Sequence, residues 1–362
     1  MYKKVFIDTN VFISEKFRLS NHKFEKLKKY TEEAQIILLY NEITEKELEV
    51  HIKEKIEEGI KSYNKVLKKY PLLEYLGKGV LEELEENKKE KIYLSLKKDL
   101  DCFFDDSINL PLKIDIKLVL EDHFNFKLPF TQKKQHEFKD AFVIQMLKNY
   151  QKQNNEKVYI ISQDKDFKGA FDNDKNFIIF EDLGKFIEKI EIEQLRRENE
   201  KLLINKIRDG EINEAIEDFI KNYIDLEIDY DSSDYEIDNY EIIRIYPEFI
   251  NSCETENIQI YEFNVKLDIE IEITYLDEYS SYYDKEDGEY LFSNYITAKE
   301  KHNTEFKLVI LCDIKDLEKK SIEEDFFLDY ITIDNEKSDK RIYLDEYTCE
   351  DREIINETIN NY

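Results

Sequence analysis

Acidic side chains stand at four points of this chain where simple solvation is a poor explanation. Two of these points directly follow or end short apolar runs, residues 5–7 and 158–162, which predict buried strands. A third lies within residues 138–147, which are apolar on nearly all sides and predict a buried helix. The fourth lies near the start of a long helix that we predict from residue 43. The acids at these points are Asp8, Glu47, Asp140, and the pair Asp164 and Asp166.

Carboxylates that gather at one place repel one another, and a divalent cation relieves that repulsion. Mg²⁺ and Mn²⁺ prefer oxygen ligands. One or two such ions can polarise a phosphodiester, activate a water and stabilise the leaving oxygen. The five histidines of the chain show no metal-ligand spacing, so the pattern favours a site built from carboxylates. These residue types therefore predict metal-dependent hydrolysis of a phosphodiester.

The elements that must position these acids are strands alternating with helices. Such alternation is typical of a parallel sheet, and the carboxyl ends of its strands meet at one edge. We therefore predict an α/β fold with the acids on that edge. The predicted strands are residues 5–7, 35–40, 158–162 and 177–180, and the predicted helices are residues 43–67, 80–105, 115–126, 138–147 and 182–192.

The order of these segments resembles that of the PIN-domain nucleases. Residues 7–12 resemble the opening motif of that family, and the segments around Glu47, Asp140 and Asp164 resemble its second, third and fourth acidic motifs. A basic loop at residues 129–134 followed by Lys-Asp-Ala-Phe resembles a larger bacterial subgroup whose members often carry a C-terminal extension. The resemblance covers about residues 1–190. It implies a Rossmann-like parallel sheet flanked by helices.

The resemblance also implies an activity, which is cleavage of single-stranded or structured RNA with one or two Mg²⁺ or Mn²⁺ ions. It implies catalytic roles for Asp8, Glu47, Asp140, Asp164 and Asp166, all but Glu47 as metal ligands. We expect neighbouring polar groups to orient these acids, namely Thr9, Asn10 and Ser162. We expect three lysines to bind the phosphate backbone, namely Lys133, Lys134 and Lys139.

Structural alternatives stand beside these roles. Asp140 could be a buried acid paired with Lys139, and Asp164 and Asp166 could be turn and helix-cap residues. The lysines could belong to a solvated basic loop.

Glu47 has its own structural alternative. Thr44-x-x-Glu47 is also the pattern of a capping box, and helical phase places Glu45 and Glu49 nearer the apolar stripe than Glu47. The family pattern nevertheless favours Glu47 as the acid of the second motif.

The net charge of −29 lies entirely in the second half of the chain. Residues 1–190 contain 35 basic and 35 acidic residues, whereas residues 191–362 contain 19 basic and 48 acidic ones. Strict apolar alternation over residues 263–273 predicts a half-buried strand in that half. We predict a nuclease domain at 1–190, a helical linker at 191–224, and an acidic β-rich domain, α+β or sandwich, at 225–362.

An acidic second domain would repel nucleic acid. It could instead contact a basic protein partner, dock on the chain's own basic loop, mimic nucleic acid or support a homo-oligomer. No apolar run of membrane-spanning length and no signal sequence is recognisable, and the four cysteines form no CxxC pair, so we expect a cytoplasmic protein without membrane contact. The alternatives to a ribonuclease are a structure-specific DNA nuclease with the same site and a catalytically inactive binding module. A toxin or phage-defence role follows only by family analogy.

Overall fold

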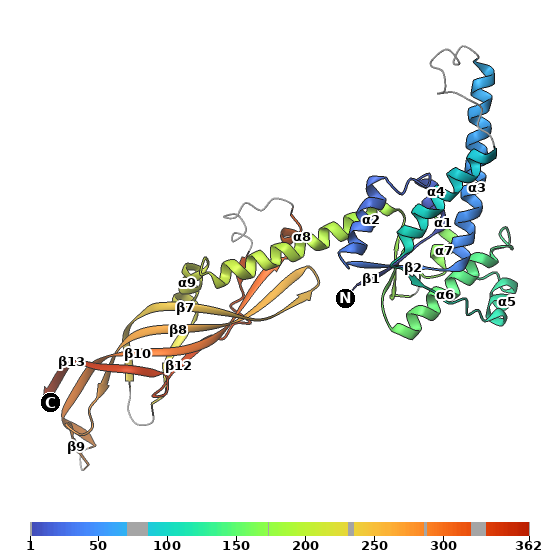
Figure 1. Ribbon diagram of the computed structural model, residues 1–362. Helices are drawn as coiled ribbons and strands as arrows, with labels where there is room; N and C mark the ends of the chain where they lie inside the picture. Colours follow the sequence, from blue (N-terminus) through green and yellow to red (C-terminus); the bar gives the residue numbers. More distant parts are fainter. Residues whose placement is uncertain are drawn as a thin grey trace. The chain divides into compact units, whose positions relative to one another are not determined.

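The computed structural model describes residues 2–70, 86–172, 174–230, 235–285, 288–319 and 331–361. The chain divides into two compact units, residues 1–190 and 191–362. Each unit has its own apolar core, and the two are described separately below. Figure 1 shows both units and labels many of their elements.

The first unit is built on a five-stranded sheet in which every strand pairing is parallel. Its strand order is β3-β2-β1-β4-β5. The strand β1 lies at the centre because its residues are apolar on both faces, and Val5 and Phe6 are almost inaccessible. The predicted parallel α/β sheet is thus confirmed. The strands are β1 (Lys3–Ile7), β2 (Ile36–Tyr40), β3 (Ile108–Asn109), β4 (Val158–Ile161) and β5 (Phe177–Phe180).

Helices cover both faces of this sheet. Val5 and Ile7 belong to one apolar cluster with residues of α1, α2 and α3, whereas Phe6 belongs to a second cluster with residues of α6. This split follows from the period of two along a strand. The helices are α1 (Thr9–Ser14), α2 (His22–Glu32), α3 (Glu42–Lys69), α4 (Glu86–Phe104), α5 (Ile116–Phe124), α6 (Phe138–Asn154), α7 (Lys165–Gly169) and α8 (Leu183–Arg208). Part of the helix predicted at 80–105 lies outside the described residues.

The strand order puts the candidate residues next to one another. Ile7, the last residue of β1, pairs with Ile161, the last residue of β4. The chain continues from β1 to β2 on one side, while β4 lies on the other side, so the β1–β4 boundary is a topological switch point. Open parallel sheets bind ligands outside the carboxyl ends of their strands at such a point. Asp8 and Ser162 are the first residues beyond these two strand ends.

The second unit is a β-rich structure dominated by antiparallel pairing, which confirms the predicted β-rich extension. Three long strands lie side by side in the order β10-β8-β7, and shorter strands pair with β10 (Figure 1). Beside this sheet, β6 and β12 form a parallel pair. The strands are β6 (Asp225–Ile228), β7 (Tyr235–Thr255), β8 (Ile258–Leu276), β9 (Tyr282–Asp284), β10 (Glu289–Asp313), β11 (Ile331–Ile333), β12 (Arg341–Leu344) and β13 (Cys349–Asn361), with helix α10 (Ile314–Leu317) after β10.

Helices also pack on the long sheet of the second unit. The segment expected as a linker, 191–224, contains the C-terminal part of α8 and the helix α9 (Asn213–Tyr223). Leu203 of α8 and Ile216 of α9 are inaccessible to solvent and belong to the same apolar cluster as Phe263 of β8. In the structure this segment is therefore part of the second unit's core. In the part of the chain that the structure describes, no helix has both the length and the apolar character needed to cross a membrane.

Candidate active site

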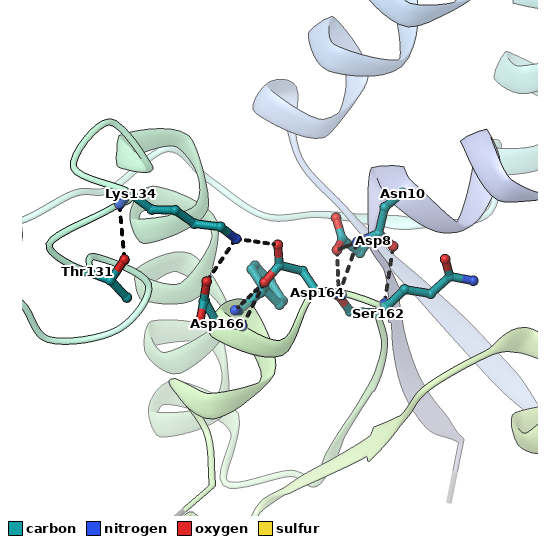
Figure 2. Close-up of polar contacts among 9 residues, drawn as sticks. Asp8, Asn10, Thr131, Lys134, Ser162, Asp164 and Asp166 are labelled. Carbon is teal, nitrogen blue, oxygen red and sulfur yellow. Dashed lines mark hydrogen bonds and ion pairs between the residues drawn. The ribbon is translucent and has the colours of Figure 1, made fainter.

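Asp8 is held at the end of β1 by two neutral donors. Ser162 Oγ and Asn10 Nδ2 each donate a hydrogen bond of 2.6 Å to Asp8 Oδ2 (Figure 2). The backbone N–H of Asp8 donates to the carbonyl of Ile161, which extends the β1–β4 ladder by one bond. Burial raises the pKa of Asp8 to about 6; the hydrogen bond from Ser162 opposes this shift and the charge of Glu47 adds to it.

Glu47 reaches the same place from α3. Its Oε2 accepts a hydrogen bond of 3.3 Å from Thr9 Oγ1, and its Oε1 accepts one of 2.9 Å from Lys139 Nζ. The capping-box alternative for Glu47 is wrong, because Asn41 is the N-cap of α3 and accepts from the backbone N–H of Thr44. Thr44 therefore lies inside the helix, and Glu47 is left to face Thr9.

Asp140 lies in the first turn of α6, where the helix N-terminus favours a negative charge. Burial nevertheless raises its pKa to about 8, and the charges of Asp8, Glu137 and Glu47 add to the shift. The alternative pairing with Lys139 is not what the structure shows, since the ammonium group of Lys139 lies 2.9 Å from Glu47. Glu137, which immediately precedes α6, was not singled out from the sequence, although its spacing of three residues from Asp140 could have indicated the contact.

Asp164 serves as the N-cap of α7 and also faces a lysine. Its Oδ1 accepts hydrogen bonds from the backbone N–H groups of Asp166 and Phe167, at 2.7 and 3.0 Å. Its Oδ2 lies 3.3 Å from Lys134 Nζ. Burial acts to raise the pKa of Asp164, but the hydrogen bonds from the Phe167 N–H and from Lys134 outweigh it and lower that pKa. The expected cap alternative is thus met by one carboxylate oxygen, while the other pairs with Lys134.

Asp166 and the basic loop form the outer part of the site. Lys134 Nζ lies 2.8 Å from Asp166 Oδ2 and so bridges Asp164 and Asp166 (Figure 2). Thr131 Oγ1 accepts a hydrogen bond from the backbone N–H of Lys134 and shapes the loop. Lys133 is exposed on the same loop.

The structure therefore brings together acids from four separate segments. We call Asp8, Glu47, Asp140 and Asp164 the acid cluster, because the last three each act electrostatically on Asp8 or feel its charge. Thr9, Asn10 and Ser162, expected as orienting groups, all make hydrogen bonds to members of this cluster or to each other. Asp166 is turned toward Lys134 instead.

The chemistry of the acid cluster fits a hard divalent cation. Its donors are carboxylate oxygens, the ligands that Mg²⁺ and Mn²⁺ prefer. The pKa values of Asp8 and Asp140 are raised first by burial and then by the charges of neighbouring acids. A cation bound among these oxygens would favour their ionised forms.

Comparison with known proteins agrees with this geometry. Residues 5–167 match the family model described as PIN domain, a segment that includes all five candidate acids. No curated protein matches the chain, and no solved structure matches it. PIN domains are generally nucleases that act on nucleic acids, so the first unit has a fold of the nuclease type. Over residues 5–167, somewhat less than half of its length, the chain is similar to the PIN domain family.

Proposed function

We propose that this protein is an endoribonuclease that depends on Mg²⁺ or Mn²⁺ and cleaves single-stranded or structured RNA with water as the nucleophile. The observation that carries the proposal is the acid cluster at the carboxyl ends of β1 and β4. Its members come from positions as far apart as Asp8 and Asp164, and two of them have raised pKa values. A fold gains no stability from crowding like charges, so a ligand of opposite charge explains the arrangement best.

The residues divide the work as follows. Asp8, Asp140 and Asp164 would hold one or two ions, with Glu47 beside them as a further acid. A bound ion would supply Lewis-acid activation of water and neutralise charge on the phosphodiester. Ser162 and Asn10 fix the orientation of Asp8 through their hydrogen bonds of 2.6 Å. Asp166, also expected as a ligand, would join the site only when its pair with Lys134 opens.

The lysines around the acid cluster are placed to bind the substrate. Lys134 and Lys139 already lie within 3.3 Å of cluster carboxylates, so a phosphate held at the cluster would come within reach of both ammonium groups. Lys133 could contact the backbone further along the strand. Because the first half of the chain carries no net charge, such local contacts must supply the attraction to RNA.

The test is cleavage of a labelled single-stranded RNA with Mn²⁺ or Mg²⁺ by the wild type and by Asp8→Asn and Asp140→Asn. We expect each substitution to lower kcat by at least about 100-fold, since each removes a ligand charge at the reacting centre. Asp172→Asn is the matched control, because Asp172 is an exposed acid of the same unit. Activity that survives both site substitutions would reject the mechanism. A DNA strand of the same sequence, run in parallel, decides between ribonuclease and DNA nuclease.

Three further outcomes address the remaining alternatives. A wild-type protein that binds RNA without cleaving it would indicate a binding module. Growth arrest of a bacterial host on expression, lost in Asp140→Asn, would support the toxin role expected by analogy. Retention of the acidic second unit by a column carrying a basic protein would support a protein partner for that unit.

A further inference from the structure

A cavity of about 850 Å³ lies beside the acid cluster in the first unit. Its walls come from α3, from α6 and from the segment that leads into α5. Most of its lining is apolar, contributed by Ile43, Val50, Leu112, Ile114, Ile116 and Phe142. Its volume lies within the range of about 300–1,000 Å³ that is usual for ligand sites.

The cavity is continuous with the acid cluster. Glu47 and Lys139 both line it, and Glu47 also accepts the hydrogen bond from Thr9, the neighbour of Asp8. A second lysine, Lys46, lies on the wall as well. A molecule with its charged group at the cluster could therefore extend an apolar part into the cavity without leaving the protein surface.

Several apolar side chains in the cavity walls are more than half exposed to solvent. The exposed fractions are 53% for Val50, 54% for Leu112 and 64% for Ile116. Contiguous exposed apolar side chains in a surface cavity commonly mark a binding surface. Phe142 adds an aromatic ring, which suits a planar ligand.

We propose that this cavity receives an unpaired nucleobase next to the phosphodiester held at the acid cluster. The proposal rests on the proposed function and makes it more specific. A nucleotide combines a planar base, whose aromatic faces can stack, with an anionic phosphate, and the cavity offers apolar walls and an aromatic ring together with Lys46 and Lys139. A peptide could contact the apolar walls, but its binding would not explain why the cavity adjoins the carboxylates and lysines.

Such a subsite selects single-stranded substrate. A base within a duplex is paired at its edge and stacked on both faces, so it can enter the cavity only after both contacts are broken. The proposal therefore places the preference for unpaired nucleic acid in these apolar walls and the chemistry in the carboxylates.

The experiment uses the full chain and a single-stranded oligonucleotide in which one nucleotide at a time is made abasic. An abasic nucleotide beside the scissile bond should raise KM about tenfold and leave kcat nearly unchanged, because stacking is lost while the phosphate contacts remain. Ile116→Asp should raise KM for the intact strand by a similar factor, and in this variant the abasic strand should be cleaved no worse than the intact one.

Leu118→Asp is the matched control. Leu118 lies on the same helix and is 50% exposed, but it does not line the cavity. Ile116 and Leu118 are both on the surface, so neither variant should change the unfolding temperature by more than a degree or two. Leu118→Asp should keep the wild-type KM.

A readout that does not depend on cleavage separates this proposal from the proposed function. A strand carrying the fluorescent base 2-aminopurine at the same position should change its emission on binding the wild type and Leu118→Asp, but not Ile116→Asp. This result without any cleavage would support the base subsite and reject the nuclease. Equal cleavage and equal emission for intact strands, abasic strands and both variants would overturn the subsite and leave the cavity to another occupant.

Discussion

Each unit of this protein holds carboxylates away from water, but their pKa values shift in opposite directions in the two units. In the second unit Glu300 is fully inaccessible, yet its pKa is lowered. Burial acts against that shift, but hydrogen bonds of 2.9 Å from His302 Nε2 and 2.6 Å from the Tyr230 hydroxyl outweigh it, together with an ion pair to Arg352. In the first unit burial and neighbouring acids raise the pKa values of Asp8 and Asp140.

In our proposal this difference separates a carboxylate with a structural role, Glu300, from carboxylates that bind a metal ion, Asp8 and Asp140. Glu300 receives its counter-charge from the fold itself, through Arg352. The groups that act on Asp140 after burial are the acids Asp8, Glu137 and Glu47. In our account a divalent cation does for Asp8 and Asp140 what Arg352 does for Glu300.

The largest effect on stability is expected at the compensated charge. Glu300→Ala leaves Arg352, Tyr230 and His302 without their common acceptor, so we expect the free energy of unfolding to fall by about 3 kcal/mol. Urea denaturation measures this loss. Glu305→Ala, an exposed acid on the same strand, should cost less than about 0.5 kcal/mol. Equal losses for the two variants would mean that Glu300 is not compensated as described.

The pKa of Asp140 is raised, so its substitution should stabilise the protein at high pH, whereas substitution of Glu300 should destabilise it. A carboxyl group whose pKa is raised on folding contributes stability below its unfolded pKa, and this contribution is lost as the pH rises through about 8 for Asp140. In the absence of metal, Asp140→Asn should therefore stabilise the protein by roughly 2 kcal/mol at pH 9 relative to wild type. The gain should vanish near pH 4. A variant less stable than wild type at pH 9 would contradict the raised pKa.

A smaller effect is expected from the bridging cation. Lys134→Gln removes the ion pairs to Asp164 and Asp166 and one contact to the substrate backbone. We expect a rise in KM of about threefold and a decrease of about one in the slope of log affinity against log salt concentration. Lys117→Gln, an exposed lysine on α5, is the control and should change neither quantity. An unchanged salt slope for Lys134→Gln would remove Lys134 from the binding surface.

The sequence was informative where pattern and burial coincide. The apolar run of β1, followed at once by Asp8, predicts both the central strand and the acid at its end. The start of α3 was predicted at residue 43, one residue from the observed Glu42, but its N-cap stayed open. Asn41 and Thr44 are both good capping residues, and only the position of Asn41 directly after β2 decides between them. That single turn determines which acid of α3 faces Thr9.

In the second unit the prediction failed where strands are irregular. The strand β7 has register shifts at Ile237/Asn239, Ile242/Arg244 and Phe249/Asn251, and each shift breaks the alternation on which a strand prediction depends. The strand β13 was missed for a related reason, since its residues 351–359 are exposed and carry no apolar alternation. The cavity beside Glu47 was also beyond the sequence, because its walls come from segments that only the fold brings together.

The central claim is that the crowded acids of the first unit bind a divalent cation, and calorimetric titration with Mn²⁺ tests it most directly. Among the described residues, one group of three possible metal ligands has all its ligand atoms within 4.8 Å of one another, namely Glu300, His302 and Cys349 of the second unit, and it provides an internal comparison. We predict that Asp8→Asn abolishes Mn²⁺ binding and that Cys349→Ser leaves it unchanged, because the charge of Glu300 is already neutralised by Arg352. Binding that persists in Asp8→Asn, or disappears in Cys349→Ser, would contradict the account.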